Sequence, residues 1–121
     1  ENVKIMRYAD VLLMAAEAAN EDGNSGLAAT YLEEVRKRAR GANNSILPIV
    51  SGGQTTLRTA IKQERRIEFA LEGERFYDLV RWGDAGSVLG GKGYQAKHRY
   101  YPIPQTAIDQ SGGVLVQNPN Y

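Results

Sequence analysis

Four carboxylates between positions 64 and 78, Glu64, Glu68, Glu72 and Asp78, are the side chains of this sequence best suited to acid–base chemistry. A glycoside hydrolase uses two such groups, one as general acid and the other as nucleophile or base. The general acid needs surroundings that raise its pKa, whereas a neighbouring arginine lowers it. The arginines Arg65, Arg75 and Arg81 stand near these carboxylates. The spacing therefore favours structural ion pairs, and a carbohydrate-active enzyme is the weaker alternative.

Two other chemical signals are weak. Residues 86–92 nearly match the phosphate-binding loop GxxxxGK[ST], but position 93 is glycine where the hydroxyl should stand, and the motif needs a strand before it. His98 is the single histidine and the chain has no cysteine, so a metal site or a histidine-dependent triad lacks partners. We expect a flexible loop, a surface histidine and no cofactor.

Aromatic side chains give the candidate ligand contacts. Tyr94, Tyr100 and Tyr101 lie in or beside a glycine-rich segment, where exposure is easier than in a helix, and sugar rings stack on exposed aromatic faces. Trp82 follows an apolar run and is expected to pack in the core. The three tyrosines are the only ligand-binding candidates that the residues themselves suggest.

Composition narrows the class of protein. The chain has 121 residues, 42% of them hydrophobic, which suits one modest core. A net charge of +1 with no basic segment predicts no nucleic-acid partner, and no apolar run is long enough to cross a membrane. The sequence opens at Glu1 without methionine, directly before a helical pattern. We expect 1–121 to be a single domain or subdomain, and a fragment of a longer protein.

The elements that would position these residues are helices. Residues 5–22 carry one apolar stripe with i, i+3, i+4 spacing, from Ile5 and Tyr8 onward, and residues 26–40 carry a second, with Arg40 on the polar side. The short connection through Gly23, with Asn24 or Ser25 as cap, predicts an antiparallel hairpin over 1–41. Its length is close to one tetratricopeptide-like unit.

After a loop at 42–55, pinned to the core by apolar side chains around Pro48, a third helix is predicted from Thr55 or Thr56 through the charged motif of 56–83. Helical phasing puts its glutamates on the packing face, and Gly73 is the point where the helix could break. A buried charge must be paired, so we expect each glutamate to find Arg65, Arg75, an arginine of the hairpin such as Arg7, Arg36 or Arg38, or backbone N–H groups of the loops. We also expect i, i+3 pairs, which are 65–68, 72–75, 75–78 and 78–81.

The remaining residues, 84–121, are predicted to form loops, one short helix opening at Pro104 and a tail tied to the surface of the helices. The fold class is thus all-α: a tetratricopeptide-like helical hairpin, a long third helix and a loop-rich C-terminal segment.

The charged motif resembles the signature ER…E…EG.R..DL.RWG of the SusD/RagB family. The positions that carry it are Glu64, Arg65, Glu68, Glu72, Gly73, Arg75, Asp78, Arg81 and Trp82. RYADVLLMAAEAAN at 7–20, YLEEVRKRA at 31–39 and YPIP at 101–104 follow in the family's order, and the ending QNPNY is similar to QNPGY. Asn120 replaces the usual glycine, and the loop from 83 to 101 is short for the family.

The resemblance implies a non-catalytic lipoprotein on the extracellular face of the outer membrane of Bacteroidota. Such a protein captures oligosaccharide, or in some members peptide, and delivers it to a TonB-dependent (SusC-like) transporter; an N-terminal lipid anchor, absent from this chain, holds it to the membrane. The chain matches only the C-terminal portion of the family. The motif positions therefore transfer as structural residues, and the ligand residues stay unknown. The alternative is a tetratricopeptide-like protein–protein interaction module with no carbohydrate role.

Overall fold

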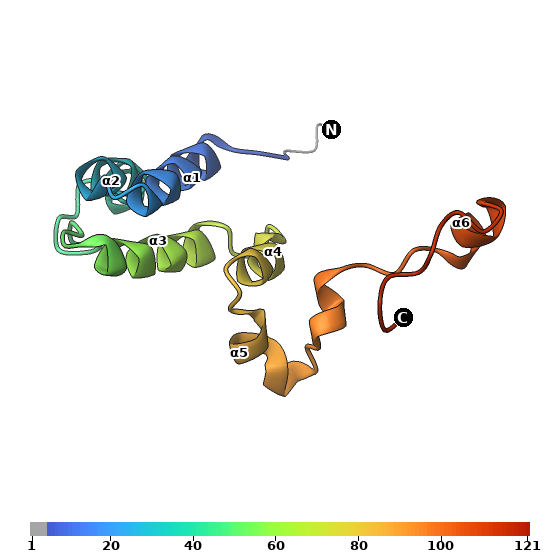
Figure 1. Cartoon of the computed structure of the whole chain (residues 1–121). Coiled ribbons are helices and arrows are strands. Elements are labelled where there is room, and N and C mark those ends of the chain that lie inside the picture. The colour runs from blue at the N-terminus through green and yellow to red at the C-terminus, as the bar shows by residue number, and fades with distance from the viewer. Residues whose placement is uncertain (1–4) are drawn as a thin grey trace. The chain divides into compact units, whose positions relative to one another are not determined.

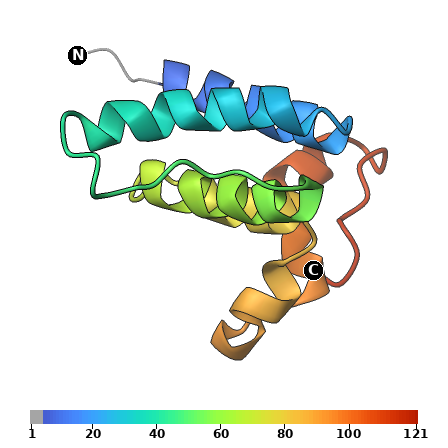
Figure 2. The same cartoon turned by 90° about the vertical axis from the view of Figure 1, so that its left-hand side faces the viewer.

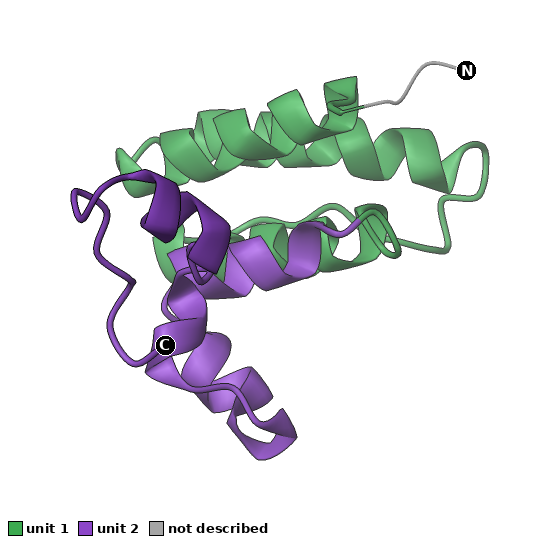
Figure 3. Ribbon diagram, turned by 90° about the vertical axis from the view of Figure 1, so that its right-hand side faces the viewer, with its two compact units in different colours: residues 1–72 green, residues 73–121 purple. Residues whose placement is uncertain are grey.

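The computed structural model describes residues 5–121, and in that range every regular element is a helix (Figure 1). The elements are α1 (Tyr8–Glu21), α2 (Ser25–Arg40), α3 (Gln54–Glu68), α4 (Glu74–Arg81), α5 (Ala85–Leu89), η1 (Gly90–Lys92), η2 (Ala96–Arg99) and α6 (Gln105–Gln110). The all-α class is confirmed. The chain divides into two compact units, residues 1–72 and 73–121 (Figure 3), and each is described by itself.

In the first unit α1 and α2 form the predicted antiparallel hairpin (Figure 2). Gly23 takes the left-handed conformation that ends α1, with φ 83°, and the Asn24 side chain accepts a hydrogen bond from the Leu27 N–H at 3.1 Å. Buried alanines on both helices let the two backbones approach closely. The hairpin is tetratricopeptide-like, as the sequence predicts.

Helix α3 lies alongside this hairpin, parallel to α2 and antiparallel to α1 (Figure 2). The three helices enclose one apolar core, formed by Ala9, Leu12, Leu13, Ala16, Ala28, Leu32, Val35, Leu57, Ile61 and Phe69. The core positions of α3 recur every three or four residues, and the same stripe continues into Glu64 and Arg65, which are also buried. The packing face of α3 is therefore apolar at its start and ionic at its end.

The prediction of one helix over 56–83 was wrong in its bounds. Helix α3 begins at Gln54 with Gly53 as its N-cap and no side-chain cap, so neither Thr55 nor Thr56 caps it. It ends at Glu68, and a turn with Leu71 at φ 69° and Gly73 at φ 89° separates it from α4. Only glycine adopts a φ of 89° at little cost, so Gly73 marks the break that the sequence left open.

The loop between α2 and α3 is held by Val50, which packs against the core as expected, and by its backbone. Ile46 and Ile49 are exposed, contrary to the expectation that they pin the loop to the core. The Leu47 carbonyl instead accepts two hydrogen bonds from Arg40, at 2.9 and 2.6 Å. Arg40 is buried, although its helical phase predicted the polar side, because its guanidinium must reach back to this carbonyl and to Glu33.

The first apolar stripe also begins later than predicted. Ile5 is 90% exposed and precedes α1, and Tyr8, in the first turn, is 71% exposed. Arg7 is the N-cap residue in an extended conformation, which its side chain's bonds to the end of α3 hold in place. The buried stripe therefore starts at Ala9.

In the second unit α4, α5 and η1 follow one another, and a long segment leads through η2 to α6. Pro104 is the N-cap of α6, one residue before the predicted position. The tail is held by the segment before α6: the Gln117 side chain bonds to the N–H and the carbonyl of Ile103, both at 2.8 Å, and Asn118 donates to the Tyr101 carbonyl at 2.6 Å. The apolar tail residues Val114 and Val116 are exposed.

Candidate functional site

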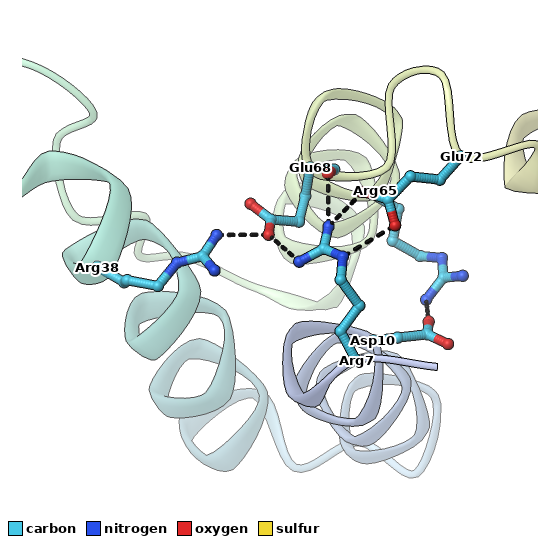
Figure 4. Close-up of polar contacts among 6 residues, drawn as sticks. All are labelled: Arg7, Asp10, Arg38, Arg65, Glu68 and Glu72. Carbon is cyan, nitrogen blue, oxygen red and sulfur yellow. Dashed lines mark hydrogen bonds and ion pairs between the residues drawn. The ribbon is translucent and has the colours of Figure 1, made fainter. Parts of the chain in front are cut away.

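An ionic cluster joins the three helices of the first unit where α1 begins and α3 ends (Figure 4). Arg7 donates to the Glu68 carboxylate at 2.7 Å, to the Glu68 carbonyl at 2.7 Å and to both Glu72 oxygens at 2.8 and 2.9 Å. Arg38, on α2, binds the same oxygen of Glu68 as Arg7 does. Five donor–acceptor contacts thus connect α1 and α2 to the end of α3 and the turn after it.

Ion pairs of Glu64 and Arg65 lie next to the cluster on α3. Arg65 donates to Asp10 on α1 at 2.8 Å, and Arg36 on α2 donates to Glu64 at 2.7 Å. The Arg36 guanidinium also donates to the Pro48 carbonyl at 3.0 Å. The side chains of Arg65 and Glu64 are each only 4% exposed, so both charges depend on these partners.

The ring of Phe69 lies beneath two members of this cluster. The guanidinium carbon of Arg7 is 4.8 Å from the ring centroid, and that of Arg65 is 5.0 Å from it. Phe69 is buried, so it offers both cations an aromatic surface inside the core. The ring thus positions Arg65, which reaches α1, and Arg7, which reaches the end of α3.

The electrostatics of the cluster oppose acid catalysis. Hydrogen bonds from Arg7 hold the pKa of Glu72 below its usual value, and the carboxylates of Glu72 and Glu68 raise the pKa of Arg7. A general acid near neutral pH requires a raised carboxyl pKa. The arrangement is suited to fastening helices together.

Of the predicted partners of the glutamates, the hairpin arginines are confirmed, whereas most predicted local pairs were wrong. Arg7, Arg36 and Arg38 all bind glutamates of this stretch. Of the i, i+3 pairs, Asp78–Arg81 is present at 2.9 Å, on α4 in the second unit. Pairs of Arg75 with residues 72 and 78 fail, since residue 72 lies outside any helix and no described residue forms a salt bridge with Arg75. Arg65 and Glu68 have other partners: Arg65 bonds to Asp10 on α1, and Glu68 bonds to Arg7 at the start of α1 and to Arg38 on α2.

Trp82, the last of the motif positions, follows α4 directly. It is half-buried, and the Arg81 guanidinium lies 4.8 Å from its ring centroid. Asp78 and Leu79 are the buried residues of α4. The motif positions of this unit therefore combine a buried carboxylate, its arginine and an aromatic ring.

Sequence reasoning missed the contacts that hold the start of α3. Asn20 is fully buried and donates to the Gln54 carbonyl at 3.1 Å, while the Gln54 side chain donates to the Asn20 carbonyl at 2.7 Å. Arg58 binds both oxygens of Glu21 at 2.7 and 2.6 Å. An asparagine on the apolar stripe of the first helix was the available signal.

The three candidate tyrosines occupy different surroundings in the second unit. Tyr94 lies edge-on to Phe76 and to His98, with centroid separations of 6.2 and 5.8 Å. The Tyr101 hydroxyl is 3.2 Å from that of Tyr77, a contact that raises the pKa of Tyr77. Tyr100 is exposed beside Arg99. Tyr94 lines a hollow of about 310 Å³.

The hairpin of the first unit carries a second hollow, of about 440 Å³, between α1 and α2. Its lining residues are Arg7, Tyr8, Ala9, Leu12, Glu34, Val35 and Arg38. Among residues 5–121 no group of histidine, aspartate and glutamate side chains has the arrangement of a metal site. The helices described here are too short or too polar to cross a bilayer.

Comparison with known proteins gives consistent matches. Residues 1–98 match the SusD family. SusD-like protein P2 of Formosa agariphila is 36% identical over 127 residues, which cover 96% of this chain and 25% of that protein. A laminarin-binding SusD-like protein superposes with a TM-score of 0.80 at 38% identity, over 100% of this chain and 23% of its own. Surface glycan-binding protein A from Bacteroides thetaiotaomicron superposes with a TM-score of 0.77 at 36% identity, over 100% of this chain and 25% of its own. The chain spans about a quarter of each.

Proposed function

The chain belongs to the SusD family, and on that premise we propose that it is the C-terminal part of a longer, non-catalytic protein that binds oligosaccharide. Two of its structural relatives are glycan-binding by name, one for laminarin and one for surface glycan. The observation that carries the proposal is the superposition of all of this chain on both of them, at more than a third identity.

The ionic cluster supports the non-catalytic part of the proposal. Glu64 and Glu68 each accept hydrogen bonds from arginines, and the arginine beside Glu72 lowers its pKa. These carboxylates therefore act as hydrogen-bond acceptors that hold α1, α2 and α3 together. A hydrolase reading of the stretch would need one of them to hold a proton at neutral pH.

We further propose that the protein acts at the extracellular face of the outer membrane and delivers its ligand to a TonB-dependent transporter. The family resemblance supports this, and we propose with it an N-terminal lipid anchor in the longer protein. Within that protein the motif residues serve as scaffold: they stabilise the helices on which glycan-binding regions are built.

Calorimetric titration of the full-length protein with a panel of oligosaccharides tests the proposal, combined with an assay for released reducing ends. Binding without release is expected. Release that the variant E68Q abolishes would contradict the non-catalytic role. Affinity purification from membranes should recover a TonB-dependent transporter, and its absence from the eluate would remove the delivery step while leaving glycan binding intact.

The hollow on the α1–α2 hairpin favours a second candidate, a tetratricopeptide-like interaction module. The exposed Tyr8 is among its lining residues, as are the cations Arg7 and Arg38 and the anion Glu34. Under this reading Y8A abolishes recovery of a protein partner and leaves glycan binding unchanged. Under the leading proposal Y8A changes neither measurement.

A further inference from the structure

The hollow in the second unit has a wall of aromatic rings and a cationic rim. Phe76, Leu89, Tyr94 and His98 line it, together with Lys92 and Gly93. Its volume of about 310 Å³ lies at the lower end of the range of small-molecule pockets, roughly 300–1,000 Å³. A hollow of this size suits a sugar ring or two, and not a longer segment of polymer.

The rings are arranged edge to face. Tyr94 meets Phe76 at an interplanar angle of 61° and His98 at 77°. Such contacts with its two neighbours fix the orientation of the Tyr94 ring. The face of an aromatic ring is electron-rich, so it attracts the weakly positive C–H groups of a pyranose.

His98 is held in one tautomer. Its Nδ1 accepts a hydrogen bond from the Gln95 N–H at 3.1 Å, within the capping box of η2. A neutral imidazole whose Nδ1 accepts must carry its proton on Nε2. The ring therefore offers a donor, and Lys92 offers three more.

The segment that surrounds the hollow is basic. Residues 85–104 contain Lys92, Lys97 and Arg99 and no aspartate or glutamate. Lys97 and Arg99 lie over aromatic rings, 5.0 Å from the centroid of Tyr121 and 5.8 Å from that of Tyr100. Lys92 is exposed, and no described residue forms an ion pair or hydrogen bond with it. A cation at the rim of an aromatic hollow, with no acid in its segment, is complementary to a ligand that carries an anion.

We propose that the hollow lined by Phe76, Lys92, Tyr94 and His98 binds a sugar ring that bears an anionic group, a carboxylate or a sulfate ester. Tyr94 receives the ring, and Lys92 and the Nε2–H of His98 receive the anion. This assignment rests on the proposed glycan-binding function and narrows it to acidic polysaccharides. A nucleic acid is less favoured, because the chain as a whole carries a charge of only +1.

The test is calorimetric titration of the full-length protein with three hexasaccharides: an oligogalacturonate, a sulfated carrageenan fragment and neutral laminarihexaose. An acidic hexasaccharide should bind more tightly than the neutral one, and its binding should weaken as salt rises. K92Q should weaken it by about tenfold, the value of one charge-assisted hydrogen bond. K37Q removes an exposed lysine from α2 in the other unit and should leave the affinity unchanged.

Two variants at position 94 separate stacking from folding. Y94F keeps the ring and should retain most of the affinity, whereas Y94A should lose it, with melting temperatures recorded for both. Tighter binding of the oligogalacturonate would identify the anion as a carboxylate, and tighter binding of the carrageenan fragment would identify it as a sulfate ester.

Equal binding of neutral and acidic hexasaccharides, or a K92Q protein that binds like the parent, would overturn this site and leave the glycan-binding function standing. No binding to any of the three, nor to a wider glycan panel, would overturn both. Tighter, Lys92-dependent binding of a single-stranded oligonucleotide would replace the sugar with a nucleic acid.

Discussion

The ion pair between Arg36 and Glu64 offers the sharpest test of how the charged stretch works. The Arg36 Nη1 lies 2.7 Å from the Glu64 carboxylate, and the two side chains are 12% and 4% exposed. The perturbation is a double-mutant cycle of E64Q, R36M and both together. Glutamine keeps the shape of Glu64 and removes its charge, and methionine keeps most of the apolar stem of Arg36.

Two opposing free energies, the attraction between the charges and the cost of removing them from water, set how much the pair contributes to stability. At 2.7 Å and an effective dielectric constant of about 20, the attraction is about 6 kcal/mol. Removing both ions from water costs several kcal/mol each, so the net contribution of the pair is small. Loss of one partner leaves the other buried without its counter-ion, which costs about 3–5 kcal/mol. The Pro48 carbonyl loses its donor in R36M and in the double variant alike, so that loss cancels in the cycle.

Urea unfolding followed by circular dichroism at 222 nm measures the three free energies. Each single variant should be less stable by about 3 kcal/mol or more, and the double variant should be more stable than the sum predicts by at least about 1.5 kcal/mol. The exposed pair Glu21–Arg58 is the matched control, and E21Q with R58M should show no measurable coupling. A loss below about 1 kcal/mol for E64Q, or strict additivity of the double variant, would refute the buried-pair reasoning.

Three other changes test separate parts of the structure. Acid should destabilise the protein through Glu72, because Arg7 lowers the pKa of this carboxyl in the folded state. The stability that Glu72 contributes is present above the ordinary glutamate pKa near 4.5 and is lost as the pH falls through the folded pKa. Urea unfolding between pH 6 and 3 measures this, and the E72Q variant should lose less stability over the same range. Gly73→Ala forces φ 89° on a residue with a Cβ and should lower stability by about 1–2 kcal/mol, whereas Gly86→Ala inside α5 should be neutral or stabilising by thermal melting. Asn20→Ala leaves the Gln54 carbonyl without its donor and should cost about 1–3 kcal/mol, while an unchanged melt would show that this bond does not hold the start of α3.

Local pattern was enough to predict the helices of the first unit. The apolar spacing of residues 9–19 and 28–35 depends only on the period of the helix, and the short link at Gly23 leaves no arrangement other than an antiparallel hairpin. The same periodicity placed Glu64 and Arg65 on the packing face. Because a buried charge needs a partner, the involvement of Arg7, Arg36 and Arg38 could also be predicted.

Which arginine binds which acid was decided by tertiary structure. Arg7 meets Glu68 across 61 positions and Arg36 meets Glu64 across 28, whereas pattern rules describe neighbours three or four positions apart. The break after Glu68 removed the helical phase on which the pairs of Arg75 depended. Arg40, on the polar side by phase, became buried because the loop carbonyl of Leu47 lies within its reach.

The sequence by itself therefore determined the helical class, the hairpin and the ionic character of the α3 packing face, since these follow from local period and from the cost of burying charge. Tertiary structure decided the bonding partners, the end of α3 and the hollow at Tyr94. Phe76, Lys92 and His98 come from separate elements with no shared period. Their meeting depends on how the turns of the second unit direct the chain, and no pattern of residue types encodes that.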